Sequence, residues 1–86
     1  MLLKTDNTIE LIEPKDKNFS LEEMQGYVGG LIELYPHRIN KNIIIIICNE
    51  EGLIKNLPYN NLAKLILGVD LVGNVIVSPT NLDEFD

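Results

Sequence analysis

The residue types that could support catalysis are few and lie apart in the sequence. The one histidine, His37, follows Pro36, and the candidate nucleophiles Ser20, Cys48 and Ser78 all lie elsewhere in the chain. A serine or cysteine nucleophile needs a base within hydrogen-bonding reach. Because a proline among polar residues indicates a turn, we expect His37 to be an exposed turn residue with no part in chemistry.

The acidic residues include two adjacent pairs, Glu22-Glu23 and Glu50-Glu51. Adjacent side chains diverge on a helix or a strand, so neither pair can converge on one substrate bond. A single cysteine excludes a cysteine-based zinc cluster, and no D-x-D-x-D-G pattern indicates a calcium site. The sequence therefore predicts a protein that is not an enzyme and uses no cofactor or metal.

Three glycines, Gly26, Gly29 and Gly30, resemble a phosphate-binding loop in composition. In such a loop the glycines precede a helix, where backbone amides and the helix dipole favour an anion. Here they lie within and after a predicted helix, near its negative end. We interpret them as the end of that helix and a tight turn into the next strand.

Local patterns predict the elements that must position these residues. Ser20 and Glu23 form a capping box that starts the first helix, and Asn60 or Asn61 caps a second, short helix that ends at Gly68. The fold class is α+β, a small mixed sheet in β-α-β-β-α-β order with two short helices packed on it. The predicted strands are residues 8–13, with Leu2 and Leu3 pairing upstream, and residues 31–35, 43–48 and 71–77, the last bulged at Gly73; polar turns are predicted at 36–42 and 49–52.

Length and composition limit the class of protein. Eighty-six residues with 45% apolar content predict one domain, residues 1–79, followed by a loosely held acidic tail, residues 80–86. The net charge of −6 and the scattered basic residues argue against DNA or RNA binding. Neither a signal peptide nor a membrane-spanning apolar run is visible. With one cysteine in an apolar run, we expect a buried thiol and a cytoplasmic protein.

The run from Ile43 to Cys48 is apolar on both faces of the predicted strand. Such a strand must be covered on both sides, and only two short helices are available to cover it. We therefore expect a homo-oligomer, most simply a dimer. A domain of this size cannot enclose a ligand cavity without losing core, so a ligand would bind in a surface groove or between subunits.

Four motifs occur in a specific order: L-E-E-M-Q-G-Y-V-G-G from Leu21, N-E-E-G from Asn49, L-P-Y-N from Leu57 and G-N-V-I-V from Gly73. In this order the chain, over roughly residues 8 to 78, resembles an uncharacterised family of small proteins encoded by bacteriophages, prophages and plasmids, a domain of unknown function. The resemblance implies a cytosolic accessory domain, in the host cytoplasm if phage-encoded, with no established enzyme activity. Relatives commonly carry basic residues after the asparagine of L-P-x-N, and this chain has Asn61-Leu62 instead.

The polar residues of these motifs are the candidate ligand- or partner-binding residues: Gln25, Asn49, Glu50, Glu51, Gly52, Tyr59, Asn60 and Asn61. Because only residues 53–57 separate the two turns, we expect both to form one surface. The first functional hypothesis is a counter-defence protein that sequesters a small nucleotide-derived immune signal at an inter-subunit site. The alternative is an interaction module that inhibits or recruits a host or phage protein. A hydrolase for such signals would need basic or metal-ligating residues that the sequence lacks.

Overall fold

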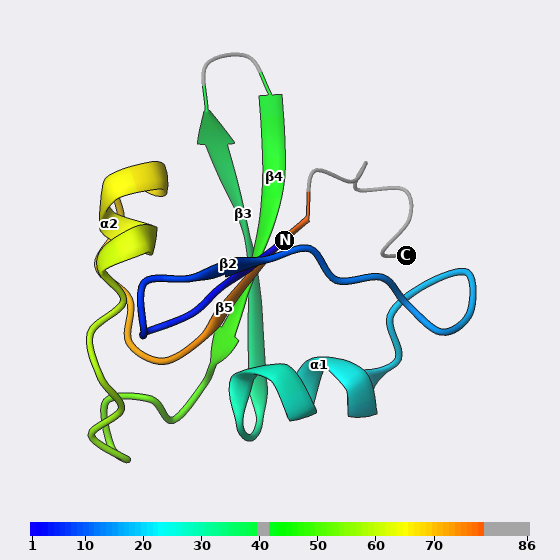
Figure 1. Ribbon diagram of the computed structural model, residues 1–86, viewed down its shortest axis with the longest axis horizontal. Helices are drawn as coiled ribbons and strands as arrows, with labels where there is room; N and C mark the ends of the chain where they lie inside the picture. Colours follow the sequence, from blue (N-terminus) through cyan, green and yellow to red (C-terminus); the bar gives the residue numbers. More distant parts are fainter. Residues whose placement is uncertain (40–41, 79–86) are drawn as a thin grey trace.

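The computed structural model describes residues 1–39 and 42–78 and arranges them as one sheet with two helices (Figure 1). Pro79 and the predicted acidic tail, residues 80–86, lie outside the described residues. The elements are β1 (Leu2–Leu3), β2 (Ile9–Glu10), α1 (Leu21–Val28), β3 (Ile32–Ile39), β4 (Asn42–Asn49), α2 (Asn61–Leu67) and β5 (Val75–Ser78). The observed order is therefore β-β-α-β-β-α-β, with one strand more than predicted.

The five strands form one sheet in the order β2-β1-β5-β4-β3. Every pairing among the described strands is antiparallel, so the predicted mixed sheet is wrong. The pairing of Leu2 and Leu3 upstream is confirmed, since they pair with Glu10 and Ile9. The predicted strand 8–13 is reduced to two residues, because the short β1 offers no further partner before the chain turns away toward α1.

Each face of the sheet is covered by one helix. On one face Val28 of α1 packs with Ile45, Ile47 and Ile76. On the other, Ala63 and Leu67 of α2 pack with Ile46, Cys48, Val75 and Val77. Figure 1 shows the sheet nearly on edge, with α2 on its left and α1 across its lower end. From Ile45 to Cys48 the apolar run of β4 is thus buried on both faces within one chain, while Ile43 stays 38% exposed. This removes most of the reason for which the sequence predicted an oligomer.

Both helices begin and end at the predicted residues. The Ser20 hydroxyl accepts from the Glu23 amide, and Gly29 ends α1 in the left-handed conformation at φ 83°. Asn60, not Asn61, is the N-cap of α2, and Gly68 ends that helix at φ 74°. These caps were predictable because each depends on residues three or four positions apart.

The predicted turn at residues 36–42 is wrong, because β3 continues through Pro36 to Ile39 and β4 begins at Asn42. Within the sheet of described strands β3 lies at an edge, and an edge strand tolerates proline because part of its backbone has no partner in that sheet. His37 is therefore in a strand and half-buried, not in an exposed turn. Its Nε2 atom donates to the Leu67 carbonyl oxygen at 3.1 Å, which links β3 to the end of α2.

The last predicted strand also starts later than expected. β5 begins at Val75, and Val72 forms only an isolated bridge with Tyr59. Gly73 is a turn residue at φ 77°, packed so closely on Leu57 that an added Cβ would lie 2.8 Å from Leu57 Cδ1. In the part of the chain that the structure describes, no helix has the length and apolarity needed to cross a membrane.

Candidate functional site

The turn that follows β4 is fixed by the Asn49 side chain. Asn49 is buried, its Nδ2 donates to the Val28 carbonyl at 3.1 Å, and its Oδ1 accepts from the Glu51 amide at 2.7 Å. These bonds tie the turn to the end of α1. Gly52 then passes Val72 so closely that a Cβ would lie 2.7 Å from Val72 Cγ2. The N-E-E-G motif thus places Glu50, which is exposed, at a defined position beside the segment that carries Val72.

The step before α2 is fixed by Asn60, which is 0% exposed. Its Nδ2 donates to the carbonyls of Leu3 and Gly73 at 2.9 and 2.8 Å, and its Oδ1 accepts from Ala63 at 2.9 Å. Both side-chain N–H groups and the side-chain oxygen of Asn60 are therefore hydrogen-bonded within the chain. Asn61, by contrast, is exposed, and its Nδ2 lies 3.5 Å from Asn7 Oδ1, which is long for a hydrogen bond.

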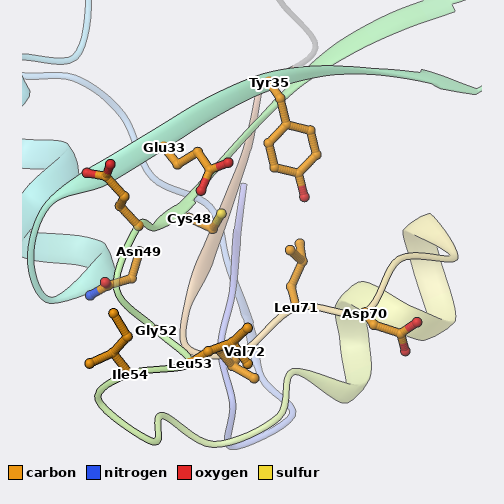
Figure 2. A pocket seen from close by; sticks show the side chains of 11 residues that line it. Glu33, Tyr35, Cys48, Asn49, Gly52, Leu53, Ile54, Asp70, Leu71 and Val72 are labelled. Atoms are coloured by element: carbon orange, nitrogen blue, oxygen red, sulfur yellow. The ribbon is translucent and has the colours of Figure 1, made fainter.

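An open groove of about 640 Å³ lies between β3, β4, the turn that follows β4 and residues 70–72. Figure 2 shows Glu33, Tyr35 and Cys48 on the strand side of this groove, with Leu53, Leu71 and Val72 across from them. Its volume is within the range of small-molecule and peptide sites. The described residues that line it are Glu33, Tyr35, Cys48, Asn49, Glu50, Gly52, Leu53, Ile54, Asp70, Leu71 and Val72.

The groove combines acidic and apolar groups. Three lining residues are carboxylates, Glu33, Glu50 and Asp70, and none of the described lining residues is basic. Leu53 and Ile54 are 80% and 81% exposed and adjacent in the chain, so the groove has apolar surface beside its carboxylates. The groove therefore favours a ligand that carries positive charge next to apolar surface.

Three titratable groups of the groove, Cys48, Tyr35 and Asp70, have shifted pKa values that favour their ordinary charge states. Burial, together with the nearby Glu33 carboxylate, raises the pKa of the Cys48 thiol to about 11, so the thiol stays neutral and unreactive at neutral pH. Burial likewise raises the pKa of Tyr35. A hydrogen bond from Tyr59 at 2.7 Å, with Lys64 at 3.5 Å, lowers the pKa of Asp70 and keeps it ionised.

The structure places the predicted site residues in three groups. Asn49, Glu50 and Gly52 line the groove, and Tyr59 touches it through its hydrogen bond to Asp70. Glu51 lies beside it and pairs with Lys55 at 3.7 Å. Outside the groove lie buried Asn60, exposed Asn61 and Gln25, the last on α1, which covers the opposite face of the sheet.

Sequence reasoning missed the strand side of the groove. Glu33 and Tyr35 lie two residues apart on one face of β3, and the register pairs them with Cys48 and Ile46. The two-residue spacing that puts Glu33 and Tyr35 on one face of a strand was visible in the sequence. The packing that brings this face close to residues 70–72 was not. Among the residues that the structure describes, no three His, Cys, Asp or Glu side chains are grouped to hold a metal ion.

One family matches the chain over residues 1–86 and is described as "Domain of unknown function (DUF3846)". No curated protein and no solved structure matches the chain. The match covers the whole sequence, so it includes every residue of the groove. The phage, prophage or plasmid origin remains a prediction from the sequence.

Proposed function

Since the chain belongs to the DUF3846 family, whose description assigns no function, we propose its function from the groove: a protein-interaction module that binds an extended, basic and apolar segment of a partner protein. The observation that carries the proposal is the coincidence, in one open groove, of three carboxylates with two exposed aliphatic side chains. We propose that the partner is a host or phage protein, which this chain inhibits or recruits.

The two kinds of group in the groove have different roles in binding. Burying an exposed leucine or isoleucine contributes about 1.5–3 kcal/mol, so Leu53 and Ile54 supply most of the affinity. An exposed ion pair contributes only about 0.2–1 kcal/mol. Glu33 and Glu50 therefore act mainly on specificity and association rate, selecting lysine- or arginine-containing segments.

The competing hypothesis, sequestration of a nucleotide-derived signal, is less well supported by this groove. A phosphorylated ligand requires basic side chains or free backbone amides. The nearby lysines, Lys55 and Lys64, do not line the groove, and each pairs with a carboxylate, Lys55 with Glu51 and Lys64 with the lining residue Asp70. A nucleotide would meet three carboxylates, of which only Asp70 has a cation, Lys64, within ion-pair distance among the described residues.

The experiment compares two labelled peptides of equal length, one alternating lysine with leucine and one alternating glutamate with leucine, by fluorescence anisotropy. The lysine peptide should bind, more weakly at high salt, and the glutamate peptide should not. Changing Glu33→Gln and Glu50→Gln together should remove two exposed ion pairs and weaken binding by about two- to thirtyfold.

The matched control is the pair Glu10→Gln and Glu22→Gln, which removes the same two charges from exposed positions outside the groove lining. If both double variants weaken binding equally, the peptide senses only net charge and the groove assignment is wrong. Binding of an unlabelled dinucleotide without binding of the lysine peptide would instead support sequestration.

A further inference from the structure

Among the described strands, none pairs with the outer edge of β3, which runs over eight residues, whereas β2, at the opposite edge of the sheet, has two. The Glu50 amide donates to the Leu31 carbonyl at 2.8 Å, in register with the pairing of Ile32 with Asn49. Hydrogen-bonded and non-hydrogen-bonded pairs alternate in an antiparallel ladder. The backbone groups of Ile32, Leu34, Pro36 and Arg38 therefore point away from β4, toward the open edge.

This alternation explains why Pro36 fits in the strand. Its missing N–H would have pointed to the open edge, so no bond to β4 is lost. The Pro36 carbonyl remains available there, together with the N–H and C=O groups of the other three residues. Seven donors and acceptors therefore face the open edge, and an incoming strand that lacks one N–H at the matching position can pair with six of them.

We propose that β3 pairs with β3 of a second copy of this chain, antiparallel and centred on Tyr35, so that the two sheets join into one. In this register Leu34 donates to the Pro36 carbonyl of the other copy, and Ile32 exchanges two bonds with Arg38. The full two-fold arrangement has six backbone hydrogen bonds. If the two-fold axis passed by Leu34 instead, four backbone hydrogen bonds would form between the copies, because Arg38 would then extend past the end of the other copy's β3.

The side chains are self-complementary in this register. On the face of α1, Leu34, which is 42% exposed, meets Pro36 of the second copy and becomes covered. On the face of α2, Tyr35 meets its symmetry mate and Glu33 lies opposite His37. No two like charges lie directly opposite each other in this register, whereas like charges in opposite positions would destabilise the pairing. A foreign strand would need to supply this same pattern, and a second copy supplies it by symmetry.

The pairing does not depend on what the groove binds, although Glu33 and Tyr35 contribute to both. Two grooves would lie near each other across the two-fold axis. Mass measurements therefore test the pairing without a ligand, so failure of the dimer and failure of the groove hypothesis can be told apart.

The first test is analytical ultracentrifugation at high micromolar concentration. The wild-type chain should sediment at twice 9.7 kDa. Leu34→Pro removes an open-edge N–H without breaking the β3–β4 hydrogen bonds. Leu34→Lys places a charge where β3 meets β3 of the second copy. Both variants should sediment as monomers. Leu65→Lys, at an 81% exposed leucine on α2, is the control and should remain dimeric. A monomeric wild type, or a dimer that both Leu34 variants leave intact, would overturn the proposal.

The second test looks for a disulfide between two copies, so its result does not depend on whether a disruptive variant still folds. Tyr35→Cys, with Cys48→Ala to leave one thiol per chain, sets two cysteines opposite each other at a non-hydrogen-bonded pair. Cβ atoms at such a pair are about 4.5–5.5 Å apart, close enough to form a disulfide after small adjustment. Mild oxidation of the Tyr35→Cys chain should give a disulfide-linked dimer. The Leu65→Cys chain, also carrying Cys48→Ala, should give much less of it. Equal or absent cross-linking would count against the pairing.

Discussion

The asparagines of the two turns show how a residue type alone leaves its role open. Asn49 and Asn60 are polar, in turns and part of the matched motifs, which is why the sequence presents them as binding residues. Both are buried, and both hold backbone segments that are far apart in the chain. The exposed groups beside them, Glu50 and Tyr59, are the ones in reach of a partner.

Replacement of Asn60 by alanine is therefore expected to lower stability strongly. The change removes a helix cap and leaves two buried carbonyls, of Leu3 and Gly73, without their donor. We expect a loss of about 2–4 kcal/mol in the free energy of unfolding, measured by urea titration. The neighbouring Asn61→Ala, at an exposed side chain, should stay within about 0.5 kcal/mol of wild type. Equal effects of the two changes would refute the role assigned to Asn60.

At the scale of elements, α1 contains two glycines with opposite requirements. Gly26 is within the helix and an added Cβ there meets nothing within 4 Å, whereas Gly29 ends the helix at φ 83°. Gly26→Ala should stabilise the protein by about 0.5–1 kcal/mol through helix propensity. Gly29→Ala should destabilise it by about 1–2 kcal/mol, and Gly29→Val at least as much, because an L-residue is strained in that conformation. Thermal unfolding of the variants should show shifts of opposite sign; the same sign for both alanines would contradict this.

Elements whose signals are local were predictable, including the pairing of Leu2 and Leu3 with the strand that follows them, and the pairings between more distant segments were not. The Ser20 capping box and the ends at Gly29 and Gly68 follow from residues within one helical turn. The extent of β3 was missed because Pro36 indicates a turn unless the strand is known to be an edge. For the same reason the groove was only half predicted. Its turn residues carry a motif, but Glu33, Tyr35 and Asp70 join them only through the register of β3 with β4 and the packing of residues 70–72.

For the whole molecule, the central question is whether the core needs a second chain. The sequence argument for an oligomer assumed that the isoleucine run could not be covered by two short helices. The structure places one helix on each face, so that Ile45, Ile46 and Ile47 are buried within one chain. If a dimer forms through β3, it joins two cores that are already complete.

The Leu34→Lys chain should accordingly be a folded monomer. Because folding and association are linked, the melting temperature of the wild-type dimer should rise by about 3–5 °C for each tenfold increase in concentration. That of Leu34→Lys should stay constant, with a cooperative transition and native far-ultraviolet circular dichroism. Leu65→Lys, which carries the same change on α2, should follow the wild type. An unfolded Leu34→Lys chain beside a folded Leu65→Lys chain would show that the core depends on association, as the isoleucine run first indicated.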